Sequence, residues 1–231
     1  MEKEKVAFYL PTRKGSERVI NKNTRPFAGI EGGLVENKVK QLLETKLIDE
    51  IIFSSNDETC MAVAEKFKDS RLRIIERPAE LCLSTTNLQD LICYVPTVTD
   101  AEHILWGHVT TPFCGADQYD AGIKLYFNKL NEGYDSLVGV TELKNFLFNC
   151  EGKLINNISD IPWPRTQDLE ALYPINHTMF LAKRKVYIEQ KNRIGVKPLL
   201  HIMDGLHSFD IDWPDDFTIA EIMYQNLFGK K

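Results

Sequence analysis

Short apolar segments alternate along the chain with longer segments in which apolar residues recur at helical spacing. The early short segments predict strands at residues 6–10, 50–54, 72–75, 103–107 and 136–140. The longer segments between them predict helices at residues 34–43, 58–67, 86–94 and 117–130. This order is typical of an α/β fold with a mostly parallel, Rossmann-like central sheet and helices on both faces. Such sheets bind ligands in the loops beyond the C-terminal ends of their strands.

The alternation stops between residues 142 and 173, where the chain is irregular and contains Pro162-Trp163-Pro164. This stretch is predicted to leave the core. The core resumes at residues 174–181, followed by a helix near 184–190, strands near 199–203 and 208–211, and a last helix at 214–227. Pro214 suits the first turn of that helix. We therefore predict one domain, residues 1–231, from which residues 142–173 protrude as an arm.

Composition narrows the class of protein. The chain is 43% hydrophobic and 26% charged, as in an ordinary globular protein. Its five cysteines are widely spaced and form no CxxC pair, which argues against a disulfide framework or a structural zinc site. No apolar run approaches 18 residues, so we expect a cytoplasmic protein without a membrane partner. The net charge of −5 argues against a nucleic-acid partner.

The positive charge is concentrated near the N-terminus. Residues 1–25 contain seven Lys or Arg residues and three Glu residues, a pattern that indicates a local anionic ligand. After the first predicted strand, Gly15 and Ser16 permit tight turns with exposed N–H groups, and Arg13, Arg18 and Lys22 add cations. Together they can hold a polyphosphate. The segment is neither GxxxxGK[ST] nor GxGxxG, and a solvated basic loop fits the bare pattern equally well.

An acidic pair follows the predicted strand at 208–211. On a strand, Asp210 and Asp212 point to one face, and two carboxylates there can bind Mg²⁺ together with substrate phosphate oxygens. The alternative is that Asp212 caps the following helix while Asp210 is paired elsewhere.

Two further segments contain polar candidates. Thr110 and Thr111, in the sequence after the fourth predicted strand, can bond a polar substrate, although this loop can equally serve only to turn the chain. Arg165, in the irregular stretch, can clamp a carboxylate bidentately or simply be a solvated arginine. The sequence contains no GxSxG motif and no cysteine with an obvious histidine partner, so covalent hydrolase chemistry is unsupported.

Taken in order, six segments of the chain resemble motifs of the CMP-sialic acid synthetase family (acylneuraminate cytidylyltransferases). Residues 12–23 resemble ARxGSKxxPxKN, residues 54–59 STDDEEIA, and residues 77–82 RPAELA. Residues 107–114 resemble LQPTSPLR, residues 164–167 with 176–181 PRxQ…NGxxYI, and residues 210–215 DIDxPxD. The resemblance covers nearly the whole chain.

The resemblance implies a nucleotide-diphosphosugar transferase fold and a homodimer whose arm reaches the neighbouring subunit's site. It implies that CTP and an acidic keto sugar are converted into the CMP-sugar and pyrophosphate with Mg²⁺ as cofactor. The residue roles that it implies fall into three groups. Arg13, Gly15, Ser16 and Lys22 would hold the triphosphate, and Asn23 and Arg77 the cytidine. Asp210 and Asp212 would bind Mg²⁺, with Asp212 also able to help deprotonate the sugar hydroxyl. His108, Thr110, Thr111, Arg165, Gln167 and Asn176 would face the sugar.

Four positions depart from the family pattern. Ile20 stands in place of proline, His108-Val109 in place of Gln-Pro, Cys114 in place of arginine, and His177 in place of glycine. Three of the four fall in or near the expected sugar pocket, so sialic, legionaminic, pseudaminic and other keto-acid sugars all stay open as substrates. Two other functions stay open as well: a glycosyltransferase of similar fold that uses Asp210 and Asp212, and a non-catalytic sugar-nucleotide binding protein.

Overall fold

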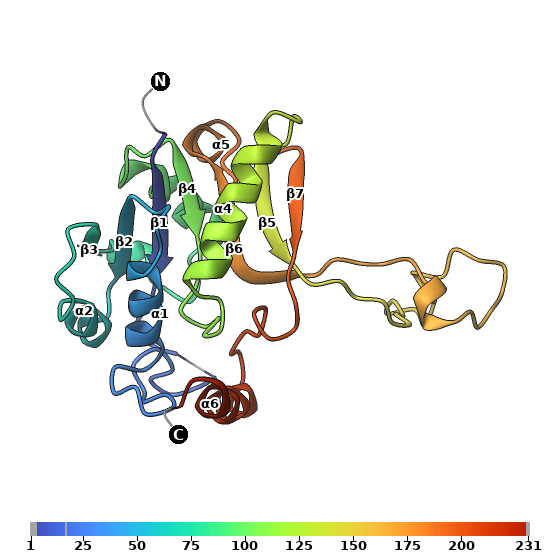
Figure 1. The fold of residues 1–231 in the computed structure, drawn as a ribbon, viewed down its shortest axis with the longest axis horizontal. Helices are drawn as coiled ribbons and strands as arrows, with labels where there is room; N and C mark the ends of the chain where they lie inside the picture. Colours follow the sequence, from blue (N-terminus) through green and yellow to red (C-terminus); the bar gives the residue numbers. More distant parts are fainter. Residues whose placement is uncertain (1–3, 17, 230–231) are drawn as a thin grey trace.

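A seven-stranded sheet forms the centre of the computed structural model, which describes residues 4–16 and 18–229 (Figure 1). The strands are β1 Val6–Pro11, β2 Glu50–Ser55, β3 Leu72–Glu76, β4 His103–Trp106, β5 Ser136–Val140, β6 Ile175–Lys183 and β7 Pro198–Ile202. Their spatial order is β3-β2-β1-β4-β6-β5-β7. Only β6 runs antiparallel to its neighbours, β4 and β5. The predicted mostly parallel sheet is confirmed.

Six α-helices accompany the strands in the described part of the chain. They are α1 Gly33–Leu43, α2 Glu58–Ala64, α3 Leu88–Tyr94, α4 Ala116–Leu130, α5 Arg184–Glu189 and α6 Pro214–Phe228. Short 3-10 turns lie at Ala79–Leu81, Val95–Thr97 and Thr166–Asp168. Helix α3 begins two residues later than predicted because Asn87 caps it, accepting a hydrogen bond from the Gln89 N–H at 3.0 Å. None of the described helices is long and apolar enough to cross a membrane.

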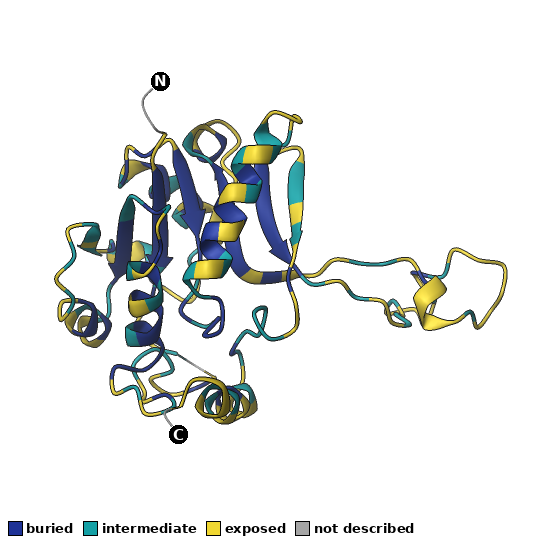
Figure 2. Cartoon of the chain, in the orientation of Figure 1, coloured by how far each residue is buried: buried dark blue, intermediate teal, exposed yellow. Residues whose placement is uncertain are grey.

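Alternate residues of β1 enter two separate cores, one on each face of the sheet. Phe8 and Leu10 pack with buried residues of α1, α4 and α6. Ala7 and Tyr9 pack on the other face with residues of α3 and α5. Figure 2 shows the central strands as the buried part of the molecule. The near-continuous apolar sequence of β1 therefore reflects burial on both faces, and the predicted placement of helices on both faces is confirmed.

The prediction of a strand at residues 208–211 is wrong. Asp204 organises a turn here: its Oδ1 accepts hydrogen bonds from the backbone N–H groups of Leu206 and His207. Its carbonyl oxygen accepts from the N–H and hydroxyl of Ser208. Beyond that turn, the Ile211 N–H donates to the Thr110 carbonyl oxygen at 2.9 Å. The segment is held by this loop contact and by its own turn, so strand alternation does not place Asp210 and Asp212.

Residues 142–173 leave the sheet between β5 and β6 and project away from it (Figure 1). Two isolated bridges, Leu143 with Leu172 and Phe148 with Leu154, join the two sides of this arm. Inside it, the buried Asn156 donates to the Asn145 carbonyl oxygen at 2.6 Å. The arm is thus ordered mainly by turns and side-chain hydrogen bonds, which explains why its sequence shows no helical or strand periodicity.

Candidate active site

A cavity of about 430 Å³ opens where the C-terminal ends of β1 and β4 meet. Because the two strands are parallel neighbours, the loops that follow them converge at this edge. The cavity is lined by Pro11, Thr12, Arg13, Gly15, Ser16, Arg18, Val19, Lys22, Asn23, Arg77, Leu81, Leu83, Ser84, Thr86, Asn87, Leu88, Leu91, Trp106, His108, Val109 and Thr110. The predicted basic loop therefore borders a cavity.

The loop after β1 is anchored at its start. The Thr12 hydroxyl donates to the Ser55 hydroxyl at 2.8 Å, and the Lys14 N–H donates to the Asn56 side chain at 3.0 Å. Gly15 has φ +83°, a left-handed conformation that glycine adopts without steric cost, and a Cβ there would meet no atom within 4 Å. Glu17 lies outside the described residues. The loop thus pairs a fixed start with an open, exposed turn suited to backbone contacts with an anion.

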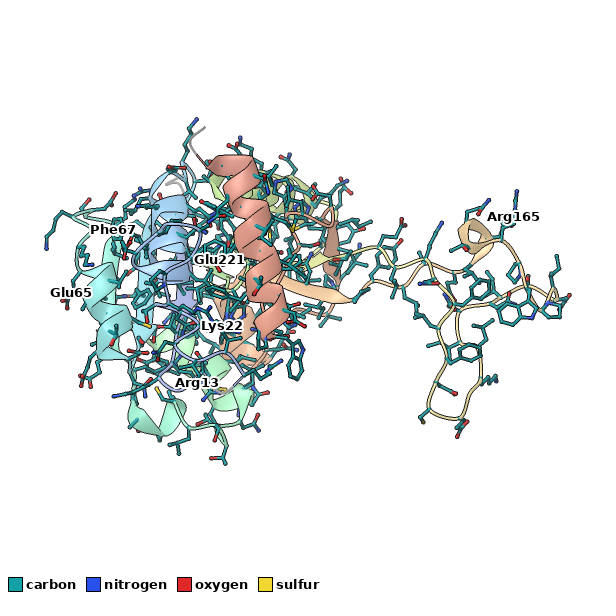
Figure 3. All side chains as sticks on the ribbon, turned by 90° about the horizontal axis from the view of Figure 1, so that it is seen from below. Arg13, Lys22, Glu65, Phe67, Arg165 and Glu221 are labelled. Carbon is teal, nitrogen blue, oxygen red and sulfur yellow. The ribbon has the colours of Figure 1, made fainter. Side chains whose placement is uncertain are left out.

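Lys22 joins this loop to the acidic segment. Its Nζ donates to the carbonyl oxygen of Ile211 at 2.7 Å. Nearby, Arg18 Nη1 lies 3.3 Å from Asp212 Oδ1. Since the Ile211 N–H is bound to Thr110, the loops after β1 and β4 and the acidic segment meet at one place. Arg13 and Lys22 both line the cavity, and Figure 3 shows the two labelled residues in the same part of the molecule.

Asp210 is largely buried, and its Oδ1 has no hydrogen-bond partner. Burial raises the pKa of this carboxyl, while a hydrogen bond with the Thr110 side chain opposes the rise. Burial lowers the pKa of Lys22, and the charges of Asp212 and Asp210 oppose that fall. A buried carboxylate oxygen without a partner lowers the stability of the folded protein. Asp210 is therefore suited to a ligand that supplies positive charge.

The acidic pair fits Mg²⁺ held jointly by protein and substrate. Among residues 4–16 and 18–229, no group of three or more His, Cys, Asp or Glu side chains is arranged to hold a metal ion. Mg²⁺ typically takes one or two carboxylates and completes its shell with water and substrate phosphate oxygens. Two carboxylates beside a cationic loop match this donor set, with the orphaned Oδ1 of Asp210 as one oxygen.

Asp212 does not cap helix α6. Its own N–H and that of Trp213 both donate to Asp216 Oδ2, at 3.0 and 2.7 Å. Asp216 therefore supplies the acceptor at the start of α6, which leaves the Asp212 carboxylate paired with Arg18 beside the cavity. The capping alternative considered for Asp212 is wrong.

His108 lies deeper in the cavity wall. Its ring centre is 6.3 Å from that of Trp106 and 6.2 Å from that of His177. Burial, with smaller effects from Arg193 and His177, lowers the pKa of His108 to about 3. The imidazole is therefore neutral at pH 7 and presents one donor and one acceptor to a ligand.

The two threonines after His108 differ in position. Thr110 lines the cavity, whereas Thr111 is fully buried and its hydroxyl donates to the carbonyl oxygen of His108 at 3.1 Å. The structure thus places Thr111 in the loop's interior, in contrast to the expectation that its hydroxyl faces the sugar. Thr111 turns inward because its hydroxyl satisfies a carbonyl of its own loop.

Lys38, which sequence reasoning missed, supports this loop from beneath. It is fully buried in α1, and its Nζ donates to the carbonyl oxygens of Thr111 and Cys114, at 2.9 and 2.6 Å, and to the Tyr119 hydroxyl at 3.1 Å. Burial lowers the pKa of this ammonium to about 8. The sequence contained one sign of this burial: Lys38 is four residues from both Leu34 and Leu42 and so lies on the apolar face of the helix.

Asn23 and Arg77, the residues expected at the cytidine, both line the cavity. Arg77 is 3% exposed, and its Nη2 donates to the Thr12 carbonyl oxygen at 2.6 Å, so it also braces the loop after β1. Sequence reasoning missed the lining residues that follow Arg77 in the chain, namely Leu81, Leu83, Ser84, Thr86, Asn87, Leu88 and Leu91. The Ser/Thr-rich sequence at residues 84–86, just before the observed third helix, was the signal for this wall.

The remaining expected sugar residues lie elsewhere in the chain. Arg165 and Gln167 lie on the arm, where Arg165 is exposed and pairs with Asp168, and Figure 3 shows Arg165 far from Lys22. Asn176 Oδ1 accepts hydrogen bonds from the backbone and hydroxyl of Thr178, while its Nδ2 is buried without a partner. The following residue, His177, has φ +58°. Within one chain, therefore, the arm residues do not reach the cavity.

Comparison with known proteins assigns the family of this chain. Residues 7–228 match the family model described as cytidylyltransferase. The chain is 25% identical over 234 residues to post-translational flagellin modification protein B of Campylobacter coli, covering 94% of this chain and 95% of that one. It is 23% identical over 225 residues to a pseudaminic acid cytidylyltransferase of Campylobacter jejuni, covering 94% of each.

Two further similarities agree with this result. The chain is 22% identical to an N-acylneuraminate cytidylyltransferase of Streptococcus agalactiae over 96% of this chain and 54% of that one. A solved CMP:2-keto-3-deoxy-manno-octonic acid synthetase in complex with CTP shares the fold, with a TM-score of 0.68 at 13% identity over 96% of this chain and 100% of that one. The family match spans the loop after β1, both strands that border the cavity, and the acidic segment. The chain is a nucleotidyltransferase that belongs to the cytidylyltransferase family.

Proposed function

We propose that this protein transfers a cytidylyl group from CTP to an acidic keto sugar of the nonulosonic type, giving the CMP-sugar and pyrophosphate. The hydrogen bond from Lys22 to Ile211 is the observation that carries the proposal. It joins the cationic loop, whose residues line the cavity, to the segment that carries the two carboxylates, and a metal-assisted triphosphate reaction needs both kinds of group together. The names of the pseudaminic acid and N-acylneuraminate cytidylyltransferase relatives support a keto-acid sugar as acceptor.

The nucleotide roles follow from position in the cavity. Arg13 and Lys22, with the backbone at Gly15 and Ser16, hold the triphosphate. Asn23 and Arg77, which also line the cavity, contact the cytidine. Asp210 and Asp212 hold Mg²⁺, which when bound offsets negative charge on the phosphate oxygens.

In the reaction, the sugar's anomeric hydroxyl oxygen attacks the α-phosphorus. The new P–O bond forms as the bond between the α-phosphorus and the bridging oxygen breaks, so pyrophosphate leaves with that bond's electrons. Asp212 accepts the hydroxyl proton, since its carboxylate is half-exposed beside the cavity. Lys22 stabilises charge that develops on the departing phosphates. His108, Thr110 and Asn176 orient the sugar, and orientation supplies much of the rate.

A matrix assay tests this proposal. Each of the four nucleoside triphosphates is combined with Mg²⁺ and a panel of sialic, legionaminic, pseudaminic and eight-carbon keto-acid sugars, and pyrophosphate release is measured. We expect turnover with CTP and at least one sugar of the panel. Release of a nucleoside diphosphate from a nucleotide sugar would instead indicate a glycosyltransferase. Calorimetric CTP binding without turnover of any pair would indicate a non-catalytic binding protein.

The arm provides the second part of the proposal, a homodimer. Several apolar side chains are exposed on it, including Ile158 at 76% and Trp163 at 71%. Exposed apolar surface of this kind is typical of an interaction site. In a two-fold dimer each arm packs on the other subunit and brings Arg165 and Gln167 to that subunit's cavity. Sedimentation is expected to show a dimer that Ile158→Asp weakens, whereas a wild-type monomer would contradict this arrangement.

Complementation distinguishes arms that act in trans from arms that act in cis. Arg165→Ala and Lys22→Met chains are each expected to be nearly inactive. If the arm serves the partner's cavity, refolding an equal mixture restores one intact site in each mixed dimer, about a quarter of wild-type activity for random pairing. If the arm serves its own cavity, every site in the mixture keeps one defect, and activity stays at the level of the single variants.

A further inference from the structure

Arg193 lies over two aromatic rings, and one of them, Trp106, lines the cavity. Arg193 belongs to the segment between α5 and β7, and its guanidinium carbon is 3.7 Å from the ring centre of Phe180 and 4.8 Å from that of Trp106. Those two residues are register partners on β6 and β4, and Trp106 lines the cavity. The aromatic pair therefore fixes the plane and position of the guanidinium.

The charge of Arg193 is not neutralised by the described part of the chain. Its side chain is mostly buried, and Nη1 is inaccessible and has no hydrogen-bond partner. Among residues 4–16 and 18–229, no carboxylate lies within ion-pair distance of it. Burial lowers the pKa of Arg193 to about 10, so the guanidinium stays charged at neutral pH. Burying an unpaired cation lowers the stability of the folded protein unless an anion pairs with it.

The surroundings of Arg193 offer donors. His108 is close enough for Arg193 to be the strongest charged influence on its imidazole, and His177 lies 6.2 Å from His108 between ring centres. A guanidinium beside a neutral imidazole suits a small planar anion.

We infer that Arg193 binds the carboxylate of the acidic sugar from within the same chain, with His108 and His177 beside it. This inference rests on the proposed function, because it assigns the recognition group for that acceptor. Arg193 would thus supply a carboxylate-binding group from the same chain as the cavity, which the arm residue Arg165 does not do. A guanidinium held flat on two rings pairs with a carboxylate bidentately at little loss of side-chain freedom.

The test pairs a change in the protein with a change in the ligand. Arg193→Met and Arg193→Lys are compared with wild type, using the sugar that reacts fastest in the panel and its C1 carboxamide at saturating CTP. Arg184→Met is the matched control, since Arg184 is another partly buried arginine, the first residue of α5, and donates to the Pro96 carbonyl oxygen. Thermal melts and near-UV circular dichroism check that each variant folds.

We expect Arg193→Met to lower kcat/KM for the carboxylate sugar by about 10- to 100-fold, as expected for loss of a charge-assisted hydrogen bond. Most of the loss is expected in the KM for the sugar, with the KM for CTP changed less than about threefold. For the carboxamide we expect less than about a threefold loss, and Arg193→Lys is expected to fall between Met and wild type. Equal losses for carboxylate and carboxamide would overturn the inference while leaving the cytidylyltransferase proposal intact.

Two other outcomes are also decisive. If Arg193→Met fails to fold, the preference of Arg193→Lys for the carboxylate sugar over its carboxamide decides. A fall in this preference of at least about fivefold relative to wild type supports the inference, and an unchanged preference overturns it.

If wild-type protein turns over no sugar of the panel with CTP, the proposed function fails first. Calorimetry of CTP-loaded wild type and Arg193→Met with N-acetylneuraminic acid then tests carboxylate binding, and equal affinities overturn the inference.

Discussion

Lys22 and Ile211 are separated by 189 positions in the chain, yet the Lys22 ammonium donates to the Ile211 carbonyl oxygen at 2.7 Å. Ile211 lies between the two aspartates, and its own N–H is bound to the loop after β4. This one contact brings the expected triphosphate loop against the expected metal ligands. Lys22 can therefore act both on the substrate and on the position of the acidic segment.

Removing the Lys22 ammonium is expected to damage catalysis more than binding. For Lys22→Met we expect kcat to fall about 10²- to 10³-fold, because charge on the departing phosphates loses a preorganised partner. Initial rates of pyrophosphate release at varied CTP concentrations measure this. Lys14→Met removes the same charge from an exposed position of the same loop and is expected to change kcat less than about fivefold. Equal kcat losses in both variants would show only a general effect of loop charge.

Lys38 is expected to hold the loop that follows β4. In Lys38→Met the carbonyl oxygens of Thr111 and Cys114 lose their buried donor, so we expect the free energy of unfolding to fall by about 2–4 kcal/mol. Urea unfolding at pH 7 measures this change. The matched variant Lys40→Met removes a surface lysine of the same helix, paired only with Glu36, and is expected to change stability by less than about 0.5 kcal/mol. A stability loss no larger than that of Lys40→Met would show that the buried contacts are not needed.

His108 is expected to make the protein sensitive to acid. Its pKa is lowered to about 3 in the folded protein, below the ordinary value of 6.5, so between these values the unfolded chain binds a proton that the folded chain does not. Stability from this group is therefore full above pH 6.5 and falls as the pH drops toward 3, by about 5 kcal/mol in all.

Unfolding of wild type and His108→Gln at several pH values between 4 and 7 isolates this effect. His103 and His201 also have lowered pKa values and contribute a fall that both proteins share. We expect the difference in stability between the two proteins to shift in favour of His108→Gln as the pH decreases. A pH-independent difference would mean that His108 titrates near its ordinary value in the folded protein.

His177 occupies a backbone conformation that normally favours glycine. Its φ of +58° costs a residue with a Cβ about 1–2 kcal/mol. We therefore expect His177→Gly to be more stable than His177→Ala by about 1 kcal/mol, the reverse of the usual order of the two residues. Both variants lose the ring contacts with His108 and Phe180. The difference in stability between them therefore reports the energetic cost of the positive φ. An alanine variant as stable as the glycine variant would contradict this account.

The elements predicted from periodicity were mostly correct because β1, β2, β4 and β5 are buried and the main helices each bury one apolar face. The strand predicted at 208–211 was wrong because Asp204 closes a turn there, and a side-chain-to-backbone hydrogen bond leaves no mark on hydrophobic periodicity. The family pattern has glycine at the position of His177, and only the structure shows that this residue has a positive φ, a conformation that glycine adopts without steric cost.

By itself, the sequence determined the α/β class, the order of the strands and helices along the chain, and the motifs of the cytidylyltransferase family, because these depend on local pattern. Only the tertiary structure showed that Thr111 faces inward, that Lys38 is a buried support, and that Arg193 lies unpaired over Trp106 and Phe180. Those facts depend on contacts between residues as much as 87 positions apart, as for Trp106 and Arg193 (193 − 106 = 87). Such contacts are set by how the sheet brings distant loops together. For Lys38, the local pattern gave only its position on the apolar face of α1 and not the loop that it supports.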